Sequence, residues 1–341
     1  MKVLLLVNKN LIPPTESLSE EKVLQEPWKT EYHVFQILNK VGHEVFIQGV
    51  GSEVSEIQKP LEDFRPNVVF NLLEEFDGEA VFDQNIVSYL EIMGVKYTGC
   101  NPTGLILARD KALSKKVLAF HDIKTPQFEV VAFKSTPYKG IALSRCKFPV
   151  IVKSLNEEAS LGISQKSVVY NEKNLTERVN FVISQLQTDV IVEEYIEGRE
   201  LYVGVLGNRR PEVFPVWELA FNSPNPVGEN IATAQVKWNS KYREKHKISL
   251  GPAHLKASEK KTIQAIAKKA YKELGLSGYA RFDFRMSSEG HFFLLEANPN
   301  PDIGKDDEFA SSARHQDMTY EELIAKILNL GIKWNPRSGI S

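Results

Sequence analysis

The sequence predicts a mixed α/β protein built from two or three lobes. Its 341 residues exceed the usual size of a single domain. Within the first 100 residues, short apolar runs alternate with segments of helical spacing, the pattern of a parallel sheet with crossover helices. Beyond about residue 190, strand-like runs predominate around one long helical segment. We therefore expect an N-terminal parallel-sheet domain followed by lobes of a different architecture.

Composition and charge narrow the class of protein. A net charge of -2 with scattered lysines gives no electrostatic reason to bind nucleic acid or an anionic membrane. The apolar run from Val3 to Val7 is too short for a signal peptide, and no window reaches the roughly 18 apolar residues of a membrane helix. Cys100 and Cys146 form neither a disulfide framework nor a metal-ligand spacing. We expect a cytoplasmic enzyme or binding protein with reduced thiols.

The N-terminal domain is expected to span residues 1–104. Its predicted strands are "KVLLLV", "HEVFIQG", "RPNVVFNLL" and "VKYTG", and its predicted helices are "EYHVFQILNKVG" and "EAVFDQNIVSYLEIMG". A segment from Leu11 to Trp28 contains three prolines and many acids and is expected to be a loop. Loops of that length in compact domains are usually functional or mobile.

Two further units are expected, a central small lobe over residues 105–192 and a larger lobe over residues 193–335. The small lobe combines the helices "KALSKKVLAFHDI" and "NLTERVNFVISQL" with the strands "QFEVVAF" and "FPVIVKS". The stretch "DVIVEEYIEG" opens the larger lobe, whose strands are "RELYVGVLG", "EVFPVWELA", "GYARFDFRM" and "HFFLLEAN". The helices "SEKKTIQAIAKKAYKELG" and "TYEELIAKILNLG" complete it.

The last two strands carry a set of oxygen ligands. The polar turn "SSEG" between them predicts a β-hairpin. Because strand side chains alternate between faces, Asp283, Glu296 and Asn298 are expected to converge on one point. Two carboxylates and an amide oxygen suit magnesium or manganese. The structural alternative is a solvated Asp, a strand-end Glu and an Asn that caps a turn.

Two lysines are placed where phosphate oxygens could bind. Lys153 ends an apolar strand and precedes a loop with Ser160 and Gly162, and Lys111 begins a helix after Asp110. Ammonium groups, backbone N–H groups and helix N-termini all favour anions. Alternatively, each lysine lies at the surface and only its aliphatic stem is covered.

The stretch "VIVEEYIEGRE" ends an apolar strand in acids, an aromatic residue and a glycine turn. A linker of this kind can offer backbone hydrogen bonds to a purine and a carboxylate to ribose hydroxyls, whereas the structural alternative is the charged rim of a hairpin. The sequence contains no GxGxxG after a strand, no GxxxxGK[ST], no HExxH and no GxSxG. It therefore lacks the usual motifs of dinucleotide-dependent dehydrogenases, P-loop ATPases, zinc proteases and serine hydrolases.

Taken together and in order, these motifs resemble the ATP-grasp superfamily, and within it most closely the D-alanine–D-alanine ligase branch. They are "RDK" with Lys111, "FPVIVKS" with Lys153, the "ASLGIS" loop, "VIVEEYIEGRELYVGVLG", "SKY" with Lys241 and Tyr242, "ARFDF" and "LLEAN". The resemblance runs from about Arg65 to Leu330. It implies an ATP-grasp fold with an N-terminal parallel-sheet domain, a small central lid lobe and a larger C-terminal antiparallel-sheet lobe.

The resemblance also implies roles for individual residues, with ATP and two magnesium ions, or manganese, as cofactors. The residues implied for the ATP phosphates are Lys111, Lys153, Ser160 and Lys241. Those implied for adenine and ribose are Glu193, Glu194, Tyr195, Ile196 and Glu200. Those implied for the metals are Asp283, Glu296, which would bridge the two ions, and Asn298. Arg281, Lys241 and Ser160 are the implied catalytic residues.

Such enzymes transfer the γ-phosphoryl group of ATP to a carboxylate and let an amine attack the resulting acyl phosphate. The sequence departs from the D-alanine–D-alanine ligase pattern at both amino-acid subsites. The first domain lacks the glycine-rich stretch with His and Glu, "NLLEEFDGEA" lacks a histidine, and Ala159 replaces a serine of the lid loop. The stretch after Asn298 is "PNPDIGKDDEF" instead of Thr-x-Pro-Gly-Met-Thr.

We therefore expect an ATP-dependent carboxylate–amine ligase that acts on amino acids or small peptides other than D-alanine. The alternatives are a divergent D-alanine–D-alanine ligase, and an ATP-binding module or small-molecule kinase that forms no amide. A homodimer is left open. Asp306, Asp307 and Glu308 either select a basic amine or cap a helix that runs toward Arg314.

Overall fold

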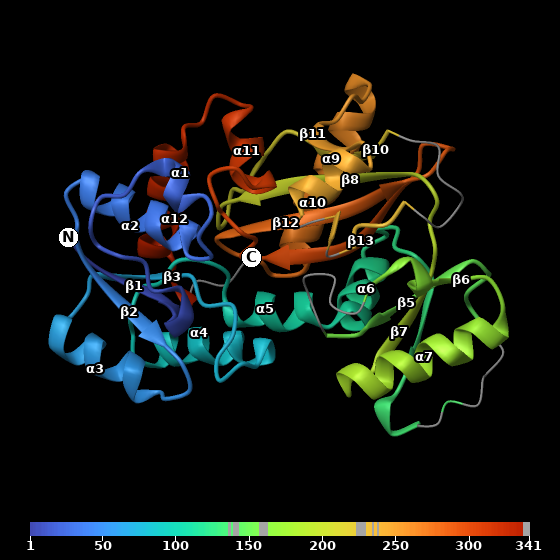
Figure 1. Ribbon diagram of the computed structural model, residues 1–341, viewed down its shortest axis with the longest axis horizontal. Helices are drawn as coiled ribbons and strands as arrows, with labels where there is room; N and C mark the ends of the chain where they lie inside the picture. The colour runs from blue at the N-terminus through green and yellow to red at the C-terminus, as the bar shows by residue number, and fades with distance from the viewer. Residues whose placement is uncertain are drawn as a thin grey trace.

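The computed structural model describes residues 1–135, 138, 143–156, 163–222, 230–233, 235, 236 and 239–336, and its strands form three sheets (Figure 1). Ser160 and the other lid-loop residues singled out from the sequence lie outside these ranges. None of the described helices is both long and apolar enough to cross a membrane.

The N-terminal sheet is parallel, as predicted, with strand order β2-β1-β3. β1 (Lys2–Asn8) lies between β2 (Glu44–Val50) and β3 (Val68–Asn71). The side chains from Val3 to Val7 are fully buried because helices cover both faces of a parallel sheet. The helices of this region are α1 (Glu20–Val23), α2 (Lys29–Lys40), α3 (Ser55–Phe64) and α4 (Asp83–Ile92).

The long segment before α2 is a loop, as predicted, interrupted by the single turn of α1. The Tyr32 hydroxyl accepts a hydrogen bond from the Leu18 amide at 2.8 Å and donates one to the Glu16 carbonyl at 3.2 Å. The first long helix of the sheet domain therefore holds the middle of this loop in place.

A second sheet is antiparallel, with strand order β4-β7-β5-β6. Its strands are β4 (Phe128–Val131), β5 (Val150–Ser154), β6 (Val168–Val169) and β7 (Val190–Glu194). α7 (Glu172–Leu186) packs on it, and α5 (Pro102–Arg109) and α6 (Lys111–Phe120) connect it to the N-terminal sheet. The strand within "DVIVEEYIEG" thus joins the second sheet, and the proposed lobe boundary between residues 192 and 193 falls inside it.

The third sheet is also antiparallel, with strand order β11-β10-β8-β12-β13, and β9 pairs with β8. Its strands are β8 (Arg199–Leu206), β9 (Glu212–Val213), β10 (Trp217–Phe221), β11 (Ile248–Pro252), β12 (Tyr279–Met286) and β13 (Phe292–Pro299). The helices of this part are α9 (Ser240–Lys245), α10 (Ala257–Glu273), α11 (Glu308–Arg314) and α12 (Tyr320–Lys333).

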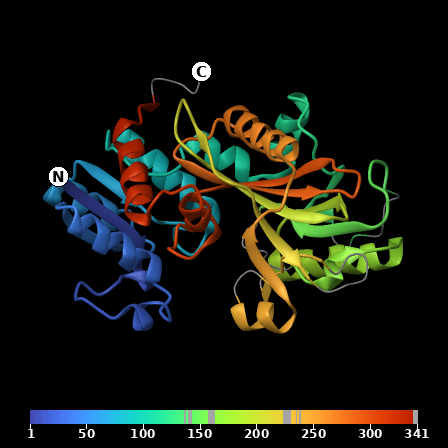
Figure 2. The same ribbon diagram turned by 90° about the horizontal axis from the view of Figure 1, so that it is seen from above.

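The C-terminal helix returns to the N-terminal sheet. α12 packs against β3, and Figures 1 and 2 both show it beside that sheet. Ile324 and Leu328 share one apolar core with Val3 and Leu5. The same core contains Leu206 of β8 and Tyr279 of β12, so the third sheet packs directly against the first.

A close backbone contact at Gly278 reinforces this joint. Gly278, just before β12, has φ +70°, and a Cβ there would lie 2.4 Å from the Gly99 carbonyl oxygen. Gly290, in the β12–β13 turn, has φ +82° and open space around it.

We predict that the two glycines respond differently to alanine. Gly290→Ala should cost about 1–2 kcal/mol of unfolding free energy from left-handed backbone strain. Gly278→Ala should cost about 1–3 kcal/mol more, because the added methyl also displaces the Gly99 backbone. Urea denaturation of both variants measures the difference, and equal losses would show that the contact adds nothing to stability.

Candidate active site

The β12–β13 hairpin brings the predicted oxygen ligands together. Asp283 pairs directly with Glu296, and Arg281 pairs directly with Asn298. Side chains at directly opposed positions of an antiparallel pair lie on one face with Cβ atoms about 5 Å apart. The prediction that these strands form a hairpin is confirmed.

Arg281 is fixed by contacts on the same sheet face. Its Nε and Nη2 atoms donate to the two carboxylate oxygens of Asp283 at 2.8 and 3.0 Å, and its guanidinium lies 5.1 Å from the centre of the Tyr202 ring. Burial alone would lower the Arg281 pKa, but Asp283 and Glu308 raise it well above its usual value. The group therefore stays charged in a fixed orientation.

The donor set around Asn298 suits a hard cation. Asn298 is half-buried near the end of β13, and its side-chain amide oxygen is a type of ligand that magnesium accepts. Glu296 is half-buried on the same strand, and Asp283 is buried opposite it. No three described His, Cys, Asp or Glu side chains cluster as a metal site, so magnesium would rely on the two carboxylates, the amide oxygen and phosphate oxygens of a substrate.

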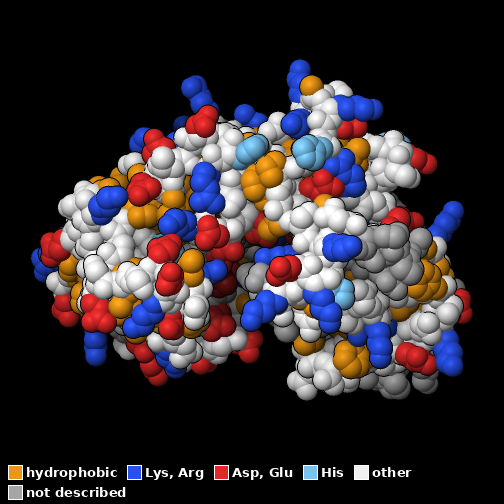
Figure 3. Space-filling model, turned by 45° about the horizontal axis from the view of Figure 1, so that its top comes forward, with side chains coloured by type: hydrophobic (Ala, Val, Ile, Leu, Met, Phe, Trp, Pro, Cys, Tyr) orange, Lys and Arg blue, Asp and Glu red, His pale blue; other side chains and the backbone are white. Residues whose placement is uncertain are grey.

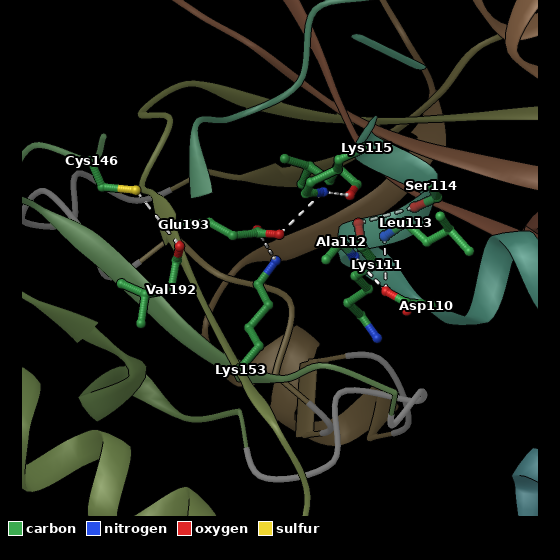
Figure 4. Close-up of polar contacts among 11 residues, drawn as sticks. Asp110, Lys111, Ala112, Leu113, Ser114, Lys115, Cys146, Lys153, Val192 and Glu193 are labelled. Atoms are coloured by element: carbon green, nitrogen blue, oxygen red, sulfur yellow. Dashed lines mark hydrogen bonds and ion pairs between the residues drawn. The ribbon is translucent and has the colours of Figure 1, made fainter. Parts of the chain in front are cut away.

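A buried chain of charges lies beside this hairpin (Figure 4). The Glu193 carboxylate at the end of β7 contacts Lys115 Nζ of α6 at 3.1 Å and Lys153 Nζ of β5 at 3.0 Å. Lys115 also donates a hydrogen bond to the Leu295 carbonyl, which directly precedes Glu296. We call Lys115, Glu193 and Lys153 the charged triad.

Burial and attraction compete within the charged triad. Burial alone would raise the Glu193 pKa, but Lys115 and Lys153 outweigh it and hold that pKa below its usual value. Burial dominates at Lys115 and lowers its pKa. At Lys153 burial would also lower the pKa, but Glu193 and Glu296 raise it. The triad therefore keeps a carboxylate and a strand-end ammonium ionised although both side chains are largely buried.

Lys111 lies in the same region, at the first position of α6 (Figure 4). Asp110 caps this helix and accepts hydrogen bonds from the amides of Ala112 and Leu113 at 2.9 and 2.8 Å. Lys111 is buried. The two predicted phosphate lysines, Lys111 and Lys153, thus lie at adjoining ends of α6 and β5.

The linker between β7 and β8 contains the residues assigned to the nucleoside. The amides of Glu194 and Tyr195 donate to the carbonyls of Gln127 and Pro149 at 2.9 and 3.0 Å. Ile196 follows, half-buried. Glu200 is buried and accepts hydrogen bonds from the Tyr202 hydroxyl at 2.9 Å and from Arg285 at 2.8 Å.

The remaining predicted residues differ in their exposure and contacts. Lys241 is exposed on α9 and forms no ion pair with another described residue. Asp307 occupies the N-cap position of α11, but its side chain makes no capping hydrogen bond. Its Oδ2 atom lies 4.0 Å from Lys29 Nζ. Glu308 approaches Arg281 at 3.8 Å, and Asp306 is exposed.

Comparison with known proteins shows which family the chain belongs to. The family model described as "D-ala D-ala ligase C-terminus" matches residues 118–329, more than half of the chain. The chain belongs to the D-Ala–D-Ala ligase family. This confirms the resemblance seen in the motifs.

Relatives and solved structures agree over nearly the whole chain. A D-alanine–D-alanine ligase of Carboxydothermus hydrogenoformans is 28% identical over 305 residues, which cover 88% of this chain and 91% of that protein. An uncharacterized protein of Sinorhizobium fredii, y4sG, is 28% identical and covers 89% of each chain. The crystal structure of D-alanine–D-alanine ligase from Bacillus anthracis complexed with ATP has a TM-score of 0.71 at 19% identity. The match covers 99% of this chain and 100% of that chain. The predicted ATP-grasp fold is confirmed.

Two buried charged residues of this family member had no role in the sequence-based prediction. Lys115 lies one helical turn after Lys111, and that four-residue spacing places both on one face of α6. Arg285 lies two residues after Asp283 and holds Glu200 across the β8–β12 pair. The spacings were visible in the sequence, but the partners that bury these side chains are distant along the chain.

Glu193→Gln tests the charged triad. We predict a loss of about 3–5 kcal/mol of unfolding free energy at pH 7, because two buried ammonium groups lose their anion. In this variant the Lys115 pKa falls further below that of the unfolded chain, so the unfolded state binds more protons. The loss should therefore shrink as the pH rises toward about 10, the ordinary lysine value.

The matched control for this variant is Glu194→Gln, at the neighbouring half-buried position. It should change stability by less than about 0.5 kcal/mol. Urea denaturation between pH 7 and pH 10 provides the measurement. A pH-independent loss in Glu193→Gln, or equal losses in both variants, would contradict the electrostatic role of the triad.

Proposed function

We propose that this chain is an ATP-dependent carboxylate–amine ligase that works through an acyl phosphate. The observation that carries the proposal is the single sheet face on which Asp283, Glu296 and Asn298 lie beside Arg281, next to the charged triad. The family match, together with the likeness to a Bacillus anthracis ligase that was crystallised with ATP, supports ATP as the phosphoryl donor.

ATP would lie between the second and third sheets. Lys111, Lys153 and Lys241 would contact its phosphates, together with Ser160 of the lid loop. Glu193 to Ile196 would frame adenine. The Glu193 carboxylate is held by two lysines, and the amides of Glu194 and Tyr195 donate within the second sheet, so other main-chain groups of this stretch would contact the base. Glu200 would accept a ribose hydroxyl and keep Arg285 as its partner.

The reaction would join a carboxylate and an amine in two steps. A carboxylate oxygen attacks the γ-phosphorus, the bond to the bridging oxygen breaks, and ADP leaves. The amine nitrogen then attacks the acyl carbon, phosphate leaves with its electron pair, and the nitrogen loses a proton. When bound to Asp283, Glu296 and Asn298, two magnesium ions, or manganese, would supply neutralising charge for the transferring phosphoryl group.

Arg281 would stabilise the oxyanion formed during amine attack. The bidentate pair with Asp283 and the Tyr202 ring hold its guanidinium before substrate arrives. Preorganised donors of this kind are worth roughly 3–4 kcal/mol in the transition state.

Substrates other than D-alanine are part of this proposal. The support comes from the departures at Ala159 and after Asn298, and from the carboxylates that follow that asparagine. The alternative activity, D-alanine–D-alanine ligation, is favoured by the names of the curated relatives at 26–29% identity. A kinase without amide formation is the alternative of another class.

A panel experiment separates the three activities. ADP and phosphate release are measured with ATP and magnesium across amino acids and amines that include D-alanine, and products are identified by mass spectrometry. The proposal predicts amine-dependent release and a new amide. Efficient D-alanyl-D-alanine formation supports the first alternative, and a phosphorylated product without amide supports the second.

Glu296→Gln tests the assigned metal ligands. The change keeps the side-chain shape and removes the charge, so we predict a loss of roughly 100-fold or more in kcat/KM, equivalent to about 3 kcal/mol. Glu289→Gln is the control, because Glu289 is exposed in the turn of the same hairpin. It should retain full activity. Equal activities of the two variants would remove Glu296 from the site.

A further inference from the structure

A cavity of about 420 Å³ lies next to the catalytic hairpin, between the N-terminal sheet and the loop after β13. Its lining includes the ends of β1 and β3, the first turn of α2, and Asn300 to Ile303. Asn300 follows the proposed metal ligand Asn298 by two residues, a separation of at most about 7 Å along an extended chain. The cavity therefore adjoins the site where chemistry is proposed.

The described lining of this cavity is strongly acidic. Its carboxylates are Glu31, Glu74, Glu75 and Asp302, and its one described ammonium group is that of Lys29. Lys29 is directed to Asp307, 4.0 Å away. The nearby Lys305 is paired with Glu20 at 2.9 Å. Neither Glu31 nor Asp302 has an ion-pair partner among the described cations, so the cavity keeps excess negative charge.

Glu31 supplies the decisive observation. Only 6% of this residue is exposed, it lines the cavity, and its Oε2 atom has no hydrogen-bond partner in the described chain. Burial, with a contribution from Asp302, raises the Glu31 pKa to about 7. The other contact of this carboxylate is a hydrogen bond from its own backbone amide. Leaving one oxygen of a buried carboxylate unpaired destabilises a protein, and such groups are concentrated at sites that bind ligands.

Asp302, a second carboxylate of the lining, is held close to the start of α2. Its Oδ1 atom accepts hydrogen bonds from the Thr30 hydroxyl at 3.1 Å and from the Gly304 amide at 2.7 Å. The loop packs tightly here, since a Cβ on Gly304 would lie 2.2 Å from Asp307 Oδ2. Figure 3 shows a hollow between the two halves of the molecule with acidic side chains along its left margin.

We propose that Glu31 and Asp302 bind a protonated amino group of the substrate and thereby select cationic substrates. This inference rests on the proposed ligase function, because it assigns the charge of one of the two joined molecules. The ligand is organic: the cavity has the size of small-molecule sites, and the described acids do not form a metal-binding cluster. A free carboxylate in this cavity would be repelled.

Calorimetric titration of the full-length protein with an ATP analogue that cannot be cleaved tests the proposal without turnover. The probes are 1,5-diaminopentane, 1,5-pentanediol and glutarate, which share one chain length and differ in charge. We expect the diamine to bind at least about 10-fold more tightly than the diol, and glutarate to bind least. Equal affinity for diamine and diol would overturn the proposal.

Three variants assign the effect to this cavity. Glu31→Gln and Asp302→Asn should each weaken diamine binding about 10-fold or more and leave binding of the ATP analogue unchanged. Asp63→Asn, at an exposed carboxylate of α3, should bind like wild type. Glu31→Gln should also keep or raise the thermal melting temperature, since it removes an uncompensated buried charge. Unchanged diamine binding in both cavity variants would overturn the proposal.

The outcome is separable from that of the ligase assay. Diamine-selective binding that depends on Glu31, without ADP release on any amine, would support the cation site and contradict the proposed function. ADP release with neutral amines, without diamine-selective binding, would support the ligase and overturn the cation site.

Discussion

The buried pairing of Glu193 with Lys115 and Lys153 is the interaction on which the rest of the site depends. It connects β7, α6 and β5, and through the Leu295 carbonyl it reaches β13. Removing one partner of such a group leaves an uncompensated charge in a low-dielectric interior. The three elements are therefore constrained to meet at one point, with the phosphate lysines on one side and the hairpin on the other.

This constraint explains how residues of the second and third sheets can form one active site. Lys115 holds the residue directly before Glu296, so the charges that would receive phosphates and those that would receive metal have a fixed separation. On the neighbouring strands, Arg285 and Glu200 form a second buried pair, and Arg281 and Asp283 a third. Each arginine has a defined direction before substrate binds, which is the condition for electrostatic preorganisation.

The sequence predicted those features that depend on local periodicity. Alternation along two strands was sufficient to place Asp283 and Glu296 on one face, and the apolar run of β1 was sufficient to predict a buried parallel strand. Other features depend on distant partners. Lys115 resembles a surface lysine of an amphipathic helix until Glu193 and Leu295 cover it. Glu31 resembles an ordinary acid in a first helical turn, and only the loop after β13 shows that it is enclosed.

Isotope transfer shows directly whether the carboxylate substrate is activated by phosphorylation. The carboxylate substrate identified by the panel is labelled with ¹⁸O at both oxygens, and the inorganic phosphate formed with ATP and amine is examined by ³¹P nuclear magnetic resonance. We predict one ¹⁸O atom in each phosphate, because the attacking carboxylate oxygen leaves with the phosphoryl group. Phosphate without label, formed together with amide, would contradict it.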